Sequence, residues 1–363
     1  MKPTRRAFLG ASAALAACTP AAPVAEPPIA DAPDIPAAVA AGARWLWAQQ
    51  DPGGAFPSRT FGVLSAGQSL TPFVLLALSE VPPALHPFPA EAAGRALAAA
   101  LGMVDDAGAL GFAAAAPDYP VYATAMLVSA IARISPSALP KHTPPLLRWL
   151  GTQQYGEGWA DHPALGGFGM GARVLPTPPD AGHVDLSMTR RALEAFAAAG
   201  QPGPGQALAF LARAQVDEGG FLYSPVDMAL NKGGHADGRY RGYGSATCDG
   251  VLALLACGVT ADDPRVQRAL AFLHRVHRVD RNPGVDPQMS AFAQAMRGYY
   301  RAGAAAVFAR LGGPEGWRPA MAAAIVAEQR PDGAWENPSA LQKESDPLIA
   351  TALALKALTK CLS

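Results

Sequence analysis

The chain has 363 residues, with 29 Lys or Arg and 29 Asp or Glu, so its formal net charge at pH 7 is zero. That length is enough for one large domain with a sizeable buried core. Because only 16% of the residues are charged and there is no basic surplus, nucleic acid is excluded as a partner. No apolar run in the sequence reaches the roughly 20 residues that a membrane-spanning helix requires.

Residues 1–18 have the layout of an export signal. Arg5 and Arg6 precede a short apolar stretch, Ala7 to Ala17. The run TRRAFLG resembles a twin-arginine signal, and the run LAAC that ends at Cys18 resembles the box at which bacterial lipoproteins are cleaved and acylated on cysteine. This predicts a mature protein that starts at Cys18 and is held by acyl chains on the periplasmic face of a membrane. The alternative is a plain signal peptide with an incidental cysteine.

Residues 19–35 are rich in Pro, Ala and acidic side chains, a composition that forms no core, and we expect a tether there. The remaining cysteines, Cys248, Cys257 and Cys361, are odd in number and do not predict a disulfide framework. Residues 36–363 are expected to form the folded domain.

Internal repetition is the most informative feature of this domain. Four segments carry a glutamine that is followed by glycine and an aromatic residue: RWLWAQQDPGGAF (44–56), RWLGTQQYGEGW (148–159), AFLARAQVDEGGF (209–221) and AAIVAEQRPDGAW (323–335). Two degenerate copies fill the gaps, DDAGALGF at 105–112 and a segment with His277 in the place of the glutamine. Glycine permits the left-handed backbone that ends a helix, so each segment predicts a helix followed by a turn.

A second helix is expected after each of these turns. The six second helices align on a column of hydroxyl residues: Thr71, Thr124, Thr189, Thr247, Ser290 and Thr351. The first helix of each unit is amphipathic, as in AFLARAQ, whereas the second is apolar nearly all round, as in TCDGVLALLACG. A water-facing helix and a buried helix, repeated six times, predict an all-α (α/α)6 toroid, whose closure removes open ends.

The turns QQYGEGW and EQRPDGAW resemble the Gln-Trp repeats of squalene-hopene and oxidosqualene cyclases. The same toroid occurs in the β subunits of protein prenyltransferases, so the chain resembles the terpenoid cyclase and protein prenyltransferase superfamily over residues 36–360. The resemblance implies a central cavity for an isoprenoid-type or other apolar ligand. Since architecture does not determine chemistry, the catalytic residues of the family have to be sought one by one.

Class II cyclases of this superfamily protonate an alkene with an Asp-x-Asp-Asp-Thr motif, whose central carboxyl group must stay protonated. The matching stretch here is HVDLSMT. Aligned on Thr189, it places Asp185 at the first aspartate but Ser187 and Met188 at the other two. The resemblance therefore implies that the acid of the family is not retained, unless another acid such as Asp180 replaces it.

Protein prenyltransferases bind zinc with an Asp-x-Cys pair and a histidine. Cys248 lies in the corresponding place, but Ala246 stands where the aspartate would be, and the last inner helix, DPLIATAL, begins without a histidine. We therefore predict no metal and no cofactor. His183 and His235 lie in loops from which they could substitute, although loop histidines are more often solvated.

Polar residues gather at the expected starts of the inner helices, and they predict a cavity mouth there. Asp185, Cys248 and Asp249 are the candidate catalytic residues. The candidate ligand-binding residues are Tyr122, Asp185, Ser187, Tyr243, Thr247 and Asp346. The positive ends of helices favour anionic groups, which is the reason for expecting a site. The alternative is that the Ser and Thr residues only cap helices.

Three functions fit these features. The first is a diverged toroid that binds an isoprenoid-type ligand in an apolar cavity with aromatic walls, with catalysis left open. The second is a non-catalytic surface scaffold with a plugged cavity that binds a peptide or protein partner. The third is a carbohydrate-active toroid with carboxylates about 5 to 9.5 Å apart, Asp185 and Asp249 being the pair. We prefer the first, although an aromatic content of 7% is low for a working cyclase.

Overall fold

The computed structural model describes residues 33–362. The predicted export signal at 1–18, the acylated Cys18 and nearly all of the predicted tether at 19–35 lie outside the described residues. No helix within residues 33–362 is both long and apolar enough to cross a membrane.

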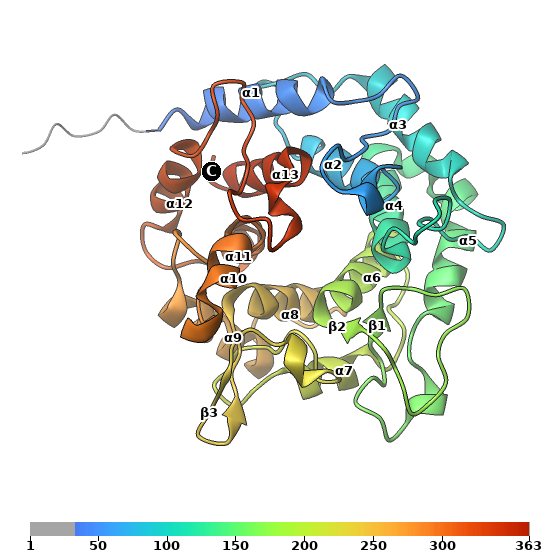
Figure 1. Cartoon of the computed structure of the whole chain (residues 1–363), viewed down its shortest axis with the longest axis vertical. Coiled ribbons are helices and arrows are strands. Elements are labelled where there is room, and N and C mark those ends of the chain that lie inside the picture. Colours follow the sequence, from blue (N-terminus) through green and yellow to red (C-terminus); the bar gives the residue numbers. More distant parts are fainter. Residues whose placement is uncertain (1–32, 363) are drawn as a thin grey trace, which may run out of the picture. The chain divides into compact units, whose positions relative to one another are not determined.

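Six helices of the described part form a closed inner ring (Figure 1). They are α2 (Leu70–Leu78), α4 (Pro120–Ile134), α6 (Leu186–Ala198), α8 (Gly244–Ala256), α11 (Arg297–Leu311) and α13 (Pro347–Leu358). Each packs against the next one in chain order, and α13 packs against α2, so the ring closes on itself. The predicted all-α (α/α)6 toroid is therefore confirmed.

The outer layer consists of the helices that precede the inner ones in the chain. They are α1 (Ile35–Trp47), α3 (Ala90–Gly102), α5 (Leu139–Thr152), α7 (Ala207–Ala214), α9 (Pro264–Val276) and α12 (Trp317–Val326). In α9 the buried residues recur every three or four positions, which leaves one wet face, whereas α8 buries every residue from Gly244 to Leu254. The two hydrophobic patterns of the repeat thus separate the two layers.

The repeated glutamine joins one unit to the next. The Nε2 atom of Gln50 donates to the carbonyl of Gly54 in its own turn (3.0 Å) and to the carbonyl of Ala92 on the next outer helix (2.8 Å). Gln215 of the fourth unit makes the same pair of bonds, whereas Gln154 of the third donates to the carbonyls of Gly166 and of Pro204, which precedes α7. Gln329, in the last unit, donates to the carbonyl of Ala38 on α1 at 2.9 Å. The contact between the last and the first unit is therefore the same as that between neighbouring units.

Two structural features of each turn require glycine, namely a positive φ and a close approach to the neighbouring outer helix. Gly54 has a φ of +99°, and a Cβ atom built on it would lie 2.6 Å from the carbonyl oxygen of Arg95. Gly333 repeats this with a φ of +94° and the carbonyl oxygen of Ala41 at 2.8 Å. Only glycine combines this backbone conformation with such a close approach to the neighbouring helix.

The threonine column holds the turns and does not line a cavity. Thr71 accepts the backbone N–H of Phe56 at 3.0 Å, and Thr124, Thr189, Thr247 and Thr351 accept the corresponding N–H group of their own turns. Ser290 was predicted as the fifth member of this column, and that prediction is wrong. It begins a short separate helix, α10 (Ser290–Ala295), and the inner helix of that unit starts only at Arg297.

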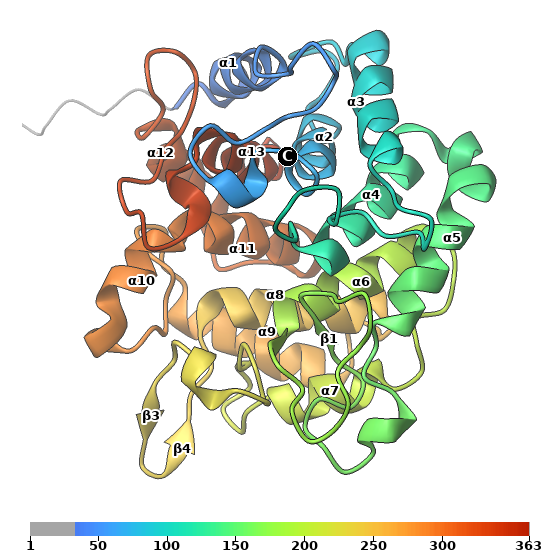
Figure 2. The same ribbon diagram turned by 45° about the vertical axis from the view of Figure 1, so that its right-hand side comes forward.

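Short elements occupy the connections. Two pairs of two-residue antiparallel strands occur among the described residues, β1 (Phe168–Gly169) with β2 (Val184–Asp185), and β3 (His235–Ala236) with β4 (Arg239–Tyr240). The second pair projects from the body as a hairpin (Figure 2). The 3-10 turns are η1 (Gly62–Leu64), η2 (Pro136–Ala138), η3 (Glu157–Trp159), η4 (Met228–Leu230), η5 (Pro287–Met289) and η6 (Lys343–Ser345). Pairing of Phe168 with Asp185 places Asp185 at the start of α6.

Candidate functional site

The starts of the inner helices, predicted as a cavity mouth, are closed. Asp185, Ser187, Tyr243, Thr247, Cys248, Asp249 and Asp346 are all buried, and Tyr122 is half-buried. None of these eight residues lines the central cavity described below. The prediction of a mouth at this end of the ring is therefore wrong.

Carboxylates at this end cap helices instead. Asp185 Oδ1 accepts the backbone N–H of Met188 at 2.9 Å, and Asp346 Oδ1 accepts that of Leu348 at 2.9 Å. The hydroxyl of Ser58 donates to the other oxygen of Asp346. These bonds satisfy the free N–H groups of α6 and α13. The two aspartates are thus structural, and the positive helix ends that were expected to attract a ligand are already occupied.

Residues that the sequence did not single out cap three other inner helices. Asp118 Oδ2 accepts the N–H of Ser69 before α2 (3.0 Å), and Asn282 Oδ1 accepts that of Ser245 in α8 (2.9 Å). Glu344 accepts two N–H groups at the start of α11, from Gly298 and Tyr299, at 2.9 and 2.8 Å. Burial is the main reason why the pKa of Glu344 is raised to about 7.

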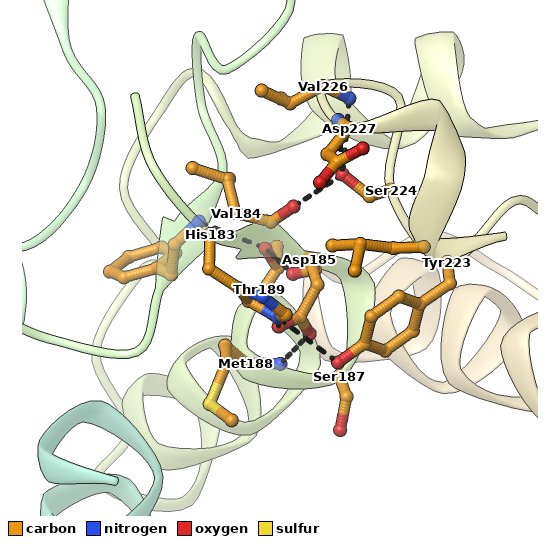
Figure 3. Close-up of polar contacts among 12 residues, drawn as sticks. His183, Val184, Asp185, Ser187, Met188, Thr189, Tyr223, Ser224, Val226 and Asp227 are labelled. Carbon is orange, nitrogen blue, oxygen red and sulfur yellow. Dashed lines mark hydrogen bonds and ion pairs between the residues drawn. The ribbon is translucent and has the colours of Figure 1, made fainter. Parts of the chain in front are cut away.

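Asp185 also holds a histidine (Figure 3). Its Oδ2 lies 2.7 Å from Nε2 of His183, and the hydroxyl of Tyr223 lies 3.4 Å from the same nitrogen. The hydrogen bond with Asp185 raises the pKa of His183. Asp185 therefore has a double structural role, as helix cap and as partner of His183, and this group is not part of the cavity.

Cys248 is unsuited to ligating a metal. It is fully buried beside Gly303 on the neighbouring helix α11, and burial raises the pKa of its thiol well above the ordinary value. The two loop histidines lie elsewhere, since His183 binds Asp185 and His235 packs edge-to-face against Tyr240 with ring centroids 4.8 Å apart. Within residues 33–362, no three His, Cys, Asp or Glu side chains are placed to share a metal ion.

A cavity of about 560 Å³ lies at the centre of the ring. All six inner helices line it, α2, α4, α6, α8 and α13 mainly through their C-terminal halves and α11 along most of its length. Its apolar wall includes Leu76, Met126, Leu252 and Leu353, together with alanines of α6 and α11. The candidate site is thus at the end of the ring opposite to the predicted mouth.

A buried polar cluster forms the floor of this cavity. Arg190 binds Asp249 of α8 at 2.7 Å and Glu194, one turn further along α6, at 2.8 Å. The hydroxyl of Tyr299 donates to Asp249 at 3.0 Å and lies 2.9 Å from the hydroxyl of Ser187. Asp249 and Ser187, both predicted as site residues, are therefore brought together, but as buried members of this cluster behind the lining.

The carboxylates that do line the cavity are ionised. Burial acts to raise the pKa of Glu194, but Arg190 and Arg191 outweigh it and lower the pKa to about 2. Glu80 behaves in the same way, because Lys356 and Lys360 hold its pKa at about 2. The Arg191 guanidinium also lies over the ring of Tyr122, 5.4 Å from its centroid, which is the role the structure gives to Tyr122.

The sequence contained a signal for this cluster. The stretch RRALE at 190–194 and Lys356 place charges on helices that are otherwise apolar and buried. Ionised side chains are almost never buried unless they are paired, so charges on an inner helix indicate a paired cluster or a site. Because the inner helices were expected to be apolar nearly all round, these charged residues were not predicted as part of a site.

No protein-family model matches the chain, and no curated protein matches it. Solved structures do match. The type II terpene cyclase MstE from Scytonema has a TM-score of 0.59 at 16% identity, covering 90% of this chain and 98% of the cyclase. A protein from Actinoplanes has 0.55 at 16%, covering 91% and 100%. A glycosidase has 0.51 at 13%, covering 90% and 97%. At these identities the likeness shows the fold, an α/α toroid shared with a terpene cyclase and with a glycosidase.

Proposed function

We propose that the toroid binds an elongated, isoprenoid-type or other apolar chain in its central cavity, without cyclising it. The observation that carries this proposal is the cavity itself, about 560 Å³ in volume, to which all six inner helices contribute apolar side chains beside the charged ones. Ligand pockets in proteins typically measure about 300 to 1,000 Å³. The fold adds support, since a variant of MstE has been solved in complex with its substrate geranylgeranyl dihydroxybenzoate.

Binding is favoured over cyclisation because the cavity offers no suitable acid. A carboxyl group that protonates an alkene must itself be protonated, and Glu80 and Glu194 are ionised and paired. Burial raises the pKa of Asp249, but Arg190 and Tyr299 engage this residue behind the cavity wall. The aromatic wall expected of a cyclase is also missing, since Tyr299 is the one aromatic residue in the lining of this cavity.

The two alternatives have less support. A plugged scaffold is at odds with the open central cavity. A carbohydrate-active site built on Asp185 and Asp249 would need both carboxylates free, but Asp185 caps α6 and Asp249 is bound by Arg190.

The proposal is tested by filling the cavity. Ala306 on α11 lines it, so Ala306→Trp should weaken the binding of geranylgeraniol at least tenfold, as measured by isothermal titration calorimetry on the folded domain. Ala98→Trp, on an exposed position of α3, is the matched control and should bind like the wild type. Native mass spectrometry of protein purified from its own host should detect a retained lipid. Unchanged affinity in Ala306→Trp, with a thermal transition like that of the control, would contradict the proposal.

We further propose, from the sequence motif alone, that the chain is exported and acylated at Cys18. Cys18→Ser should then move the protein from the membrane fraction to the periplasmic fraction and abolish incorporation of labelled palmitate. Cys257→Ser, at a half-buried position of the toroid, should leave both readouts unchanged. Labelling that survives in Cys18→Ser would count against the anchor.

A further inference from the structure

The central cavity has an unusual charge for a site that takes an apolar chain. Six cationic side chains line it, namely Arg133, Arg190, Arg191, Arg310, Lys356 and Lys360. Two carboxylates, Glu80 and Glu194, share the lining, and Asp249 behind the floor adds a third. Positive charge therefore exceeds negative charge by three within the cavity and its floor.

Helix dipoles explain part of this surplus but not all of it. Arg133, Arg310, Lys356 and Lys360 lie in or just after the last turn of their helices, where the negative helix end favours a cation. Arg190 and Arg191 lie in the first half of α6 and are buried, so neither the dipole nor water stabilises them. Arg190 is matched by Asp249 and Glu194. Arg191 remains to be explained.

One edge of the Arg191 guanidinium has no acceptor. Its single hydrogen bond to a described residue runs from Nη1 to Glu194 at 2.9 Å. Nε is buried without a partner, and Nη2 has none among the described residues either, although the side chain is only 7% exposed. These two nitrogens share the edge through which arginine binds a carboxylate or phosphate with two parallel bonds. A buried donor without a partner, such as Nε of Arg191, indicates a missing acceptor.

The depth of Arg191 in the cavity indicates which end of the ligand lies innermost. Side-chain exposure falls from 34% for Lys360 to 16% for Lys356 and 7% for Arg191, so the cavity deepens from a cationic rim toward Arg191. Lys356 lines the same cavity as Arg191, and burial first and the charge of Arg191 second lower its pKa. The apolar wall, with Leu76 and Leu353, lies around this path.

We infer that the ligand is an amphiphilic acid that enters headgroup first, its oxyanion accepting two hydrogen bonds from the free edge of Arg191 beside Lys356. The acyl or isoprenoid chain then contacts the apolar wall and points toward the rim. This inference rests on the proposed function and adds its headgroup chemistry. A carboxylic acid and a phosphate monoester share that chemistry.

The test compares ligands that differ only in the headgroup. Geranylgeranoic acid should bind the wild type about tenfold to a hundredfold more tightly than geranylgeraniol, the range expected for a charge-assisted pair of bonds. Geranylgeranyl phosphate is measured in the same way. Whichever of the two acids binds more tightly shows whether the headgroup is a carboxylate or a phosphate. Arg191→Gln should weaken the binding of the acid tenfold to a hundredfold and that of the alcohol much less, so that the preference for the acid is lost.

Controls separate this inference from the proposal on which it rests. Arg133→Gln, at the exposed rim, should retain most of the preference, and Arg191→Lys should retain the charge but lose the paired geometry and most of the preference. If Arg191→Gln does not fold, Lys356→Met provides the same comparison. Equal affinities for acid and alcohol in the wild type would overturn the inference and leave the proposed function intact. Binding of neither the acids nor the alcohol would overturn both.

Discussion

The two ends of the inner ring are built from the same six helices but differ in chemistry. At the N-terminal ends, Asp185, Asp346, Asp118 and Glu344 accept backbone N–H groups, and the end is closed. Toward the C-terminal ends the ring is hollow, and Lys and Arg side chains line the hollow. The helix dipole favours this division, since it attracts carboxylates to one end and cations to the other. The end that looks richest in catalytic residue types is therefore the structural end.

The largest effect should come from breaking the floor of the cavity. Arg190→Met leaves Asp249 buried without its ion partner, which should lower the free energy of unfolding by about 3 to 5 kcal/mol in urea denaturation. Arg239→Met is the control, because its pair with Asp217 is exposed and should contribute less than about 1 kcal/mol. Equal losses in the two variants would show that the floor is not a stabilising cluster.

The two ends should respond to pH in opposite directions. Glu80 and Glu194 have a pKa of about 2, below the ordinary 4.5, so the folded state binds fewer protons than the unfolded state. Their contribution, at most about 3 kcal/mol each, is present above pH 4.5 and is lost as the pH falls toward 2. Glu344, with a pKa of about 7, binds a proton more tightly when folded, so stability falls as the pH rises from 4.5 to 7.

Two variants separate these contributions in a pH series of urea denaturation. Glu80→Gln should flatten the acid limb, and Glu344→Gln should remove the loss between pH 4.5 and 7. If Glu344→Gln instead steepened that loss, the description of the closed end would be wrong.

A smaller effect is expected from the cap of α6. Asp185→Ala should cost about 1 to 2 kcal/mol and lower the pKa of His183, measured by NMR titration of its ring, because the hydrogen bond that raises that pKa is lost. Asp185→Asn keeps an acceptor for Met188 and should recover most of the stability but not the pKa. Both variants should bind geranylgeraniol like the wild type. A selective loss of binding would return the functional site to the N-terminal end.

The sequence by itself determined the architecture. The Gln-Gly turns are local and recur in four of the six units, and the amphipathic and apolar patterns assign each helix to a layer without knowledge of its partners. Even so, the register of the fifth unit was missed, because Ser290 imitates the hydroxyl column while the inner helix begins at Arg297.

Only the tertiary structure decided which end of the ring is hollow and what the polar residues do. Asp249 and Arg190 lie on different helices, 59 residues apart, and whether they form an active site or a neutralised floor depends on distances that no local pattern encodes. The same holds for Arg191, whose free edge is apparent only once every nearby acceptor has been placed. Helix formation follows from short-range periodicity, whereas a cavity is what remains after the side chains of all six inner helices have packed.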